Sequence, residues 1–290
     1  MLLWQRQHLS VQSAMKIGRF SIQEVIFGFF RLDGGCMFGS VPKNLWSKSI
    51  PADNENRIRL ACRSLIIHDG SRRFLIDVGM GEKWSDKQRQ IYAIENNPPS
   101  IWGFDPTTIT DIILTHLHFD HAGGISHLDT AGTPQLSYPN ARVHLQKANW
   151  DHAQNPTLKD RASYLPDTVL PLKNAPLILH EDSAEIVPGL KLHRVDGHTK
   201  GQQWIEISDG GHTLFFGTDL IPTSHHIPLP YHMGYDVCAE TLLQEKAFFL
   251  ERAVKENVVV CFQHDSDIAA CKVGMSDKGH YQVKEKISLS

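Results

Sequence analysis

The residues best suited to chemistry lie in the segment THLHFDHAGG, residues 115–124, directly after an apolar run. His116, His118, Asp120 and His121 supply imidazole and carboxylate groups, which are the ligands that zinc, iron and manganese take in proteins. If the strand continues through the segment, His116, His118 and Asp120 point to one side, because side chains alternate with period two. The pattern predicts a metal site at the end of a buried strand.

A metal site needs ligands from other parts of the chain, and three more junctions of the same kind supply them. His198 lies in GHTKGQ, Asp219 in FFGTDL and His264 in FQHD. Each follows an apolar run that reads as a strand, and loops at one end of a sheet converge. The carboxylate of Asp219 is of the type that can bridge two ions.

The elements that must position these residues are mostly strands. The patterns predict strands at residues 21–32, 60–68, 74–78, 111–115, 141–144, 177–179, 184–186, 190–195, 204–207, 212–217 and 258–262. They predict a hairpin at the turn 69–71, a mixture of helix and loop at 82–104 and a helix at 241–255. The glycine-rich stretch 33–46 reads as an irregular loop. Strands in both halves with helices between them predict an α/β fold of two packed sheets with helices outside.

The composition restricts the classes of protein. The chain has 290 residues and a net charge of -3, which argues against a nucleic-acid partner. Its five scattered cysteines are typical of reduced thiols in a cytoplasmic protein. No apolar run is long enough for a membrane span or a signal peptide. Residues 1–15 are interpreted as a loose N-terminal extension, and residues 16–290 as a single domain.

Together with Asp77 in FLIDVGMG, the segments HLHFDHAGG, GHTKGQ, FFGTDL and FQHD resemble the motifs of the metallo-β-lactamase superfamily. The motifs span most of the chain, and the resemblance implies a four-layer αββα sandwich of two mixed β-sheets with helices outside. The pattern is most similar to the dinuclear branch that includes N-acyl-homoserine lactonases, some of them quorum-quenching, and glyoxalase II.

That resemblance implies one metal held by His116, His118 and His198, and a second held by Asp120, His121 and His264, with Asp219 as the bridge. It implies a hydrolase in which a bridging hydroxide opens a lactone or related carboxylic ester, oriented by Asp120, which also passes a proton. Two zinc ions are the first expectation, with manganese, iron and cobalt as alternatives. No cysteine stands at the bridging position, unlike in zinc β-lactamases with a cysteine ligand.

Two other reactions remain open from the sequence. The first is hydrolysis of a phosphodiester, organophosphate or thioester at the same site. The second is oxidation of a persulfide-type thiol at a single iron held by His116, His118 and His198. The ligands Asp120, His121 and His264 would have no purpose in such a mononuclear site.

A small-molecule substrate with an acyl or aromatic part is expected, because apolar and aromatic residues fall in the two segments nearest the ligands. The expected pocket residues are Met37, Phe38, Trp46, His225, His226 and Tyr235. Pro222 stands where the lactonases carry a tyrosine that holds the substrate carbonyl, so Tyr235, His225 or His226 would have to replace it. Trp46, Phe29 and Phe30 fit a homodimer interface as well as a pocket.

Three further residues are expected to fix the histidine ligands through hydrogen bonds. They are Asp77, Thr199 and Asp265, each of which lies next to a ligand motif or at a strand end.

Overall fold

The fold is built on two mixed β-sheets, seen in the computed structural model, which describes residues 14–289. The first sheet has the order β1 (Met15–Ile17), β2 (Phe20–Asp33), β3 (Arg57–His68), β4 (Arg73–Ile76), β6 (Asp111–Ile113), β9 (Arg142–Gln146) and β10 (Leu177–His180), and β5 (Glu95–Asn96) pairs with β2. The strands from β1 to β4 pair antiparallel, whereas β4, β6, β9 and β10 pair in parallel.

The strands of the second sheet are arranged in the order in which they occur along the chain. Its strands are β11 (Ala184–Val187), β12 (Leu190–Val195), β13 (Gln202–Asp209), β14 (His212–Phe216), β15 (Val259–Cys261), β16 (Ala270–Met275) and β17 (Tyr281–Ile287). All neighbours pair antiparallel except β14 and β15, which the long helix α7 (Ala239–Lys255) connects in parallel. A separate two-stranded ribbon consists of β7 (Ser126–Leu128) and β8 (Pro134–Leu136).

Alternate residues along each strand pack into different cores, which is why the sheets form layers. Leu214 and Phe216 of β14 pack between the two sheets, against Phe74 and Ile113 of the first sheet. The intervening Phe215 faces outward and packs against Phe249 of α7. The same alternation along β6 places Ile112 on the opposite, outer face of the first sheet.

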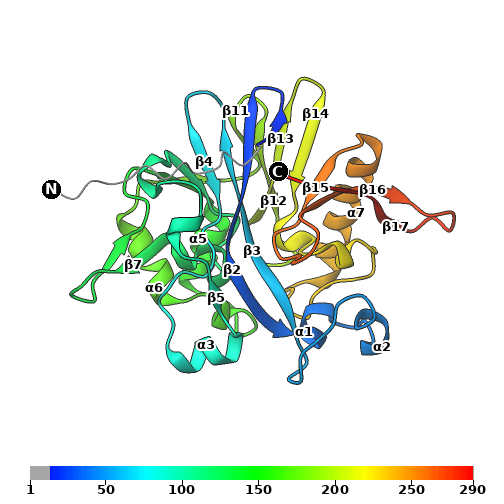
Figure 1. Cartoon of the computed structure of the whole chain (residues 1–290), viewed down its shortest axis with the longest axis horizontal. Coiled ribbons are helices and arrows are strands. Elements are labelled where there is room, and N and C mark those ends of the chain that lie inside the picture. The colour runs from blue at the N-terminus through cyan, green and yellow to red at the C-terminus, as the bar shows by residue number, and fades with distance from the viewer. Residues whose placement is uncertain (1–13, 290) are drawn as a thin grey trace.

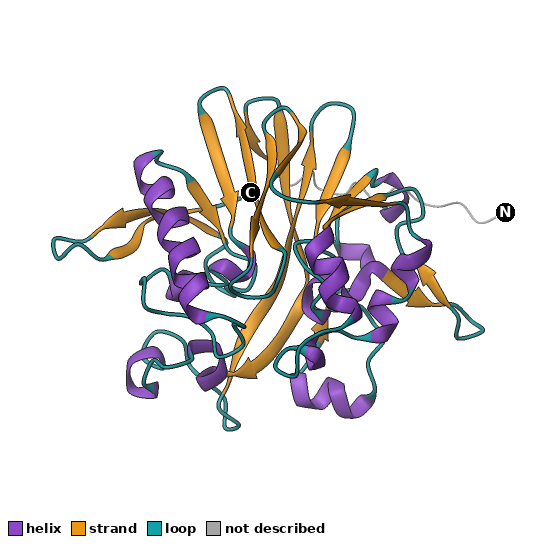
Figure 2. Ribbon diagram, turned by 180° about the vertical axis from the view of Figure 1, so that it is seen from behind, coloured by secondary structure: helices purple, strands orange, loops and turns teal. Residues whose placement is uncertain are grey.

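Helices cover both outer faces, so the molecule has four layers in the order αββα (Figures 1 and 2). On the first sheet the helices are the short α3 (Asp86–Tyr92), α4 (Phe119–Ala122), α5 (Lys147–Gln154) and α6 (Pro166–Val169), and on the second sheet α7. The short helices α1 (Gly34–Phe38) and α2 (Lys43–Trp46) follow the end of β2 and lie below α7 in Figure 1. This is the fold that the sequence resemblance implied. Within residues 14–289, no helix combines the length and the apolar character that crossing a membrane requires.

The predicted hairpin is confirmed as β3 and β4, and the helix predicted at 241–255 is confirmed as α7. The interpretation of 33–46 as an irregular loop was wrong, because two short helices form there. The side chain of Asp33 accepts a hydrogen bond from the Cys36 backbone at 2.8 Å and so caps the first turn of α1. The hairpin β16–β17 was not predicted. The predicted N-terminal extension lies outside the described residues apart from 14 and 15, and Met15 begins β1.

Candidate metal centre

The predicted ligands come together at one edge of the sandwich, where strands of both sheets end. Each of the strands β6, β12, β14 and β15 ends three residues before its first candidate ligand. The carboxyl ends of β12, β14 and β15 point the same way, because β14 and β15 are parallel and β12 is two antiparallel steps from β14, and the ligands after β6 meet theirs. The four junctions recognised in the sequence are therefore neighbours in space.

The segment 115–124 does not continue as a strand, which corrects one prediction. Strand β6 ends at Ile113, and a single helical turn, α4, begins after His118. The predicted placement of Asp120 on one side with His116 and His118 is therefore wrong. The turn directs Asp120 and His121 toward His264 instead.

The helical turn fits here because Gly123 and Gly124 let it approach the segment after β4. A Cβ atom on Gly124 would lie 2.2 Å from Val78 O, and one on Gly123 would lie 2.2 Å from Met80 O. The backbone contact is completed by Val78 N, which donates to His121 O at 2.8 Å. The HAGG sequence is thus a packing requirement of the turn that carries two of the ligand candidates.

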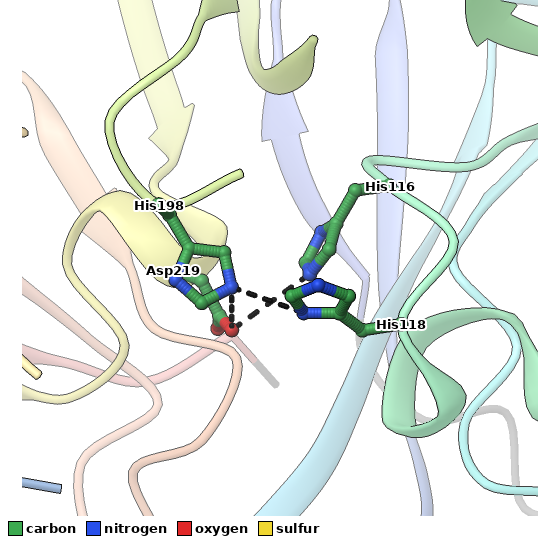
Figure 3. Close-up of side chains that lie close together, drawn as sticks. All are labelled: His116, His118, His198 and Asp219. Atoms are coloured by element: carbon green, nitrogen blue, oxygen red, sulfur yellow. Dashed lines mark hydrogen bonds and ion pairs between the residues drawn. The ribbon is translucent and has the colours of Figure 1, made fainter. Parts of the chain in front are cut away.

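The seven residues form two buried groups. His116, His118, His198 and Asp219 form the first, drawn in Figure 3, and Asp120, His121 and His264 form the second; in each group the candidate ligand atoms lie within 4.8 Å of one another.

The carboxylate of Asp219 touches both groups. Its Oδ2 atom lies 3.1 Å from His198 Nε2 and 3.3 Å from His121 Nε2, and its Oδ1 atom lies 3.1 Å from His264 Nε2. Asp120 Oδ2 lies 3.6 Å from the Nε2 atoms of both His121 and His264. The position of Asp219, between the two groups, is the one expected of a carboxylate that bridges two ions.

Hydrogen bonds fix the tautomers of four histidines so that Nε2 faces the centre of the site. His121 Nδ1 donates to Asp77 Oδ2 at 2.9 Å, His198 Nδ1 donates to Asp236 Oδ1 at 2.8 Å, and His264 Nδ1 donates to Ala61 O at 2.8 Å. His116 Nδ1 lies 3.1 Å from Thr115 Oγ1. A ring nitrogen that donates outward leaves the other nitrogen with a free lone pair, the form that binds a metal.

Asp77 therefore forms a hydrogen bond with a candidate ligand, His121, as the sequence predicted. It is fully buried, has φ +53°, and also accepts hydrogen bonds from Thr115 and from Gln263 Nε2 at 2.8 Å. A left-handed conformation is unfavourable for a residue other than glycine, and these four hydrogen bonds to its carboxylate hold it.

Thr199 and Asp265 do not contact the imidazole rings. The hydroxyl of Thr199 lies 2.7 Å from Tyr164 Oη and donates to Asp160 at 3.2 Å. Asp265 accepts from the backbone and hydroxyl of Ser224 and from two further backbone N–H groups. Both residues hold the loops that follow the ligands rather than the ligands themselves, which differs from the prediction.

The turn that carries Asp219 is held in a similar way. Thr218 has φ +48°, and the side-chain oxygen of Gln202 accepts hydrogen bonds from Thr218 Oγ1 at 2.6 Å, Asp219 N at 3.0 Å and Leu220 N at 3.2 Å. Gln202 lies on β13, next to β14, so the sheet itself positions the turn. Neither Gln202 nor Asp236 was identified from the sequence.

The charges of the site favour a cation. Burial and the neighbouring histidines hold the pKa values of His116 and His118 well below the usual range. Burial opposes protonation of His198 and His121 as well, but the nearby carboxylates outweigh it, raising the pKa of His198 to about 9 and holding that of His121 well above its usual range. Without another cation, the carboxylates draw protons onto these two rings. A divalent ion would replace those protons.

The donor set fits a pair of divalent ions. His116 Nε2 is buried and has no hydrogen-bond partner in the described part of the chain, and His118 Nδ1 lies 3.2 Å from His198 Nε2. Histidine nitrogens and carboxylate oxygens at this density suit zinc, and iron, manganese and cobalt also accept them. We therefore find that the residues present can hold the ions that the motif implies.

The centre opens into a cavity of about 190 Å³. His118, Asp120, His198, Asp219 and His264 form its floor, and its apolar walls are Leu32, Met37, Leu60, Tyr92, Phe119 and Met233. Of the predicted pocket residues, Met37 and Tyr235 line this cavity. Tyr92, Phe119 and Met233 were not among the predicted residues.

The other four predicted pocket residues do not line it, which corrects the prediction. Phe38 stacks between Trp46 and His226, with ring centroids 5.3 and 4.6 Å away. His226 is buried, and its Nε2 donates to Met37 O at 2.7 Å. Phe38, Trp46 and His225 border a different cavity, beside β17. The stacked rings of Trp46, Phe38 and His226 thus hold the backbone next to Met37, through the hydrogen bond from His226 to Met37 O.

Pro222 also has a structural part. Its carbonyl accepts a hydrogen bond from His264 N at 2.9 Å, so this position holds a ligand loop through its backbone. Among the three residues considered as replacements for the lactonase tyrosine, only Tyr235 reaches the cavity that contains the metal centre.

Comparisons with known proteins agree with this fold. An N-acyl homoserine lactonase from a Bacillus species and one from Bacillus cereus are each 31% identical to the chain over 175 residues, which are 59% of this chain and 62% of each relative. The alignments thus cover less than two thirds of those relatives.

Solved structures match over more of the chain. A probable metal-dependent hydrolase from Staphylococcus aureus has a TM-score of 0.83 and 29% identity, and the match covers 94% of this chain and all of the other. AidC, a dizinc quorum-quenching lactonase in complex with a product, has the same fold with a TM-score of 0.76 at 20% identity, over 96% and 98% of the two chains. Residues 57–264 match the sequence profile of the Metallo-beta-lactamase superfamily. This match covers well over half of the chain, which therefore belongs to the metallo-beta-lactamase superfamily.

Proposed function

We propose that the protein is a hydrolase of carboxylic esters, lactones included, and that it works with two divalent ions, for which zinc is the first candidate. The observation that carries the proposal is Asp219, which touches both groups of buried ligand candidates at the floor of an open cavity. The lactonases among its relatives support the same class of reaction.

His116, His118 and His198 would hold one ion, Asp120, His121 and His264 the other, and Asp219 would bridge them. Ions bound in this way supply an acidified water molecule and polarise a carbonyl oxygen. The protein's own groups then have defined tasks. The walls of Leu32, Met37 and Leu60 receive an apolar part of the substrate and exclude water from it.

Asp120 is the group proposed to handle the proton. Its carboxylate lies on the cavity floor next to His121 and His264. In ester hydrolysis the acyl C–O bond breaks while water adds to the carbonyl carbon, and the alcohol oxygen must gain a proton. A carboxylate at this place can take that proton from the water and return it to the leaving oxygen.

Tyr235 is proposed to donate a hydrogen bond to the substrate carbonyl. Burial raises the pKa of the Tyr235 hydroxyl above its ordinary value, so the hydroxyl stays neutral and can donate a hydrogen bond at neutral pH. It would take over the task of the lactonase tyrosine, which Pro222 cannot perform.

The test is hydrolysis by zinc-loaded protein of N-hexanoyl homoserine lactone and of 4-nitrophenyl acetate, with bis-4-nitrophenyl phosphate for comparison. Asp120→Asn should lower kcat by about 10²–10⁴-fold on the carboxylic esters. Asp129→Asn is the matched control, because Asp129 is a half-buried turn residue of the β7–β8 ribbon that does not line the cavity, and it should leave the rate unchanged. A phosphodiester hydrolysed faster than both carboxylic esters would contradict the proposal.

A further inference from the structure

One wall of the metal-containing cavity differs in chemistry from the rest. Residues Lys159, Ala162 and Ser163, which follow α5, supply this wall, while the facing walls are apolar. Among residues 14–289, Lys159 is the only lysine or arginine that lines the cavity. Because a single cation lies opposite apolar side chains, a bound molecule with one charged end is favoured in one orientation, with its charged end at Lys159.

Lys159 is free to bind a further acceptor. Its Nζ donates to Gly234 O at 2.7 Å, and an ammonium group has three donors. Within residues 14–289 no carboxylate forms a salt bridge with it, and its side chain is exposed. The bond to Gly234 holds the ammonium group at the rim, beside Met233 and Tyr235, instead of letting it extend into solvent.

The charge of the loaded site adds to this argument, which rests on the function proposed above. The two ions proposed above would carry four positive charges, and the four buried carboxylates of Asp77, Asp120, Asp219 and Asp236 would balance them. Lys159 is then the group that makes the rim positive, and a positive group at an entrance attracts ligands of negative charge.

We infer that Lys159 is a specificity-determining residue that binds an anionic group, such as a carboxylate, on the part of the substrate remote from the scissile ester. The substrate class is therefore an ester or lactone with an apolar chain that ends in, or carries, a negative charge. The apolar walls receive the chain, and Ser163, half-buried beside Lys159, offers a second donor to the anion.

A purely structural part for Lys159 makes a different prediction. If the bond to Gly234 O only ties the loop 231–236 to the segment after α5, its loss would disturb Asp236 and thereby His198. Hydrolysis of every ester would then fall together. If Lys159 binds the anion, only charged esters respond.

The experiment compares two esters of one leaving group, the mono-4-nitrophenyl ester of glutaric acid and 4-nitrophenyl butyrate, with zinc-loaded protein. Lys159→Met should lower kcat/KM about 10-fold on the anionic ester, mainly through KM, and change it less than twofold on the neutral one. Lys159→Arg should keep most of the preference. Lys173→Met, an exposed lysine outside the cavity, is the matched control and should change neither rate.

Salt supplies an independent readout. Raising ionic strength should reduce the preference of the wild-type protein for the anionic ester and leave Lys159→Met unaffected, because an exposed charge is screened. An equal fall on both esters in Lys159→Met, or no fall on the anionic one, would overturn the inference.

Binding separates this inference from the proposed hydrolysis. Calorimetry with glutarate and butyrate measures the same contrast without turnover, and glutarate should bind the wild-type protein about 10-fold more tightly than it binds Lys159→Met. If neither ester is hydrolysed, the proposed function fails, while this result still decides the inference. Glutarate that binds no more tightly than butyrate to the wild-type protein would overturn it.

Discussion

Asp219 touches members of both ligand groups, and its position depends on residues that do not face the cavity. Gln202 holds the turn around it, and Asp236 and Asp77 fix the rings of His198 and His121. Groups that orient ligands in this way contribute strongly to metal affinity, because a rotated imidazole no longer directs its lone pair at the ion.

Asp236→Asn tests this at the level of one residue. The amide keeps the size of the side chain but no longer accepts from His198 with a full negative charge. We expect metal affinity to fall about 10–100-fold, measured by competition with a chelating dye. Asp196→Asn is the matched control, since Asp196 lies two residues from His198 but contacts Arg194 and the Gly201 backbone. Equal affinity in the two variants would contradict the assignment.

At the residue scale the sequence predicts the ligand candidates better than their supports. The candidates are recognisable because imidazole and carboxylate groups recur after apolar strands. Asp77 is recognisable for the same reason. Asp236 is not, since it lies in a loop 38 residues from the ring that it holds, and no local pattern connects the two. No local pattern predicts the pocket walls either. Met37 and Phe38 are adjacent in the sequence, yet of these two only Met37 lines the cavity that contains the metal centre.

Among the elements, α4 shows why a periodic pattern misled the prediction. The alternation of His116, His118 and Asp120 is typical of a strand, but the two glycines that follow allow a helical turn to pack closely against residues 78–80. A single turn is too short to produce a helical period in the sequence. Long elements such as α7 carry several periods and are predicted well.

Helix α7 also holds the loop that borders the cavity. Lys246, a fully buried residue of α7, donates from Nζ to Pro228 O at 2.9 Å and to Tyr231 O at 2.6 Å. Burial lowers the pKa of this ammonium group to about 7. Between about pH 7 and 10 the unfolded chain therefore binds more protons than the native one, and stability rises with pH by up to about 1.4 kcal/mol per unit.

Lys246→Met should remove this contribution. We expect the free energy of unfolding in urea, measured at pH 7, 8 and 9, to rise less steeply with pH in Lys246→Met than in the wild-type protein. Lys255→Met, at the exposed end of the same helix, should keep the wild-type slope. Identical slopes in all three proteins would show that Lys246 is not the titrating group.

In the whole molecule, the centre joins the two halves of the sandwich. The first sheet supplies His116 to His121, and the second supplies His198, Asp219 and His264. The sequence predicts most of this architecture because most of the buried strands carry a clear apolar run, whereas the buried strand β16 was missed. Of the residues that line the cavity outside the ligand candidates, it predicts only Met37 and Tyr235, because the walls combine strand ends, short helices and loops that lie far apart in the sequence.

Removal of the ions should therefore loosen the link between the sheets. Ions that bind only the native state stabilise it by mass action. We expect chelation to lower the Tm by several degrees and zinc to restore it, as measured by calorimetry, with a smaller response in Asp219→Asn. A Tm that does not respond to the chelator would contradict a metal centre between the sheets.

The most direct test of the central claim is the metal content of the purified protein, counted per chain by mass spectrometry of the elements. We expect two divalent ions per chain, most of them zinc, with occupancy reduced in Asp219→Ala. A single iron per chain, with persulfide oxidation and no ester hydrolysis, would contradict it and would favour a mononuclear centre at His116, His118 and His198.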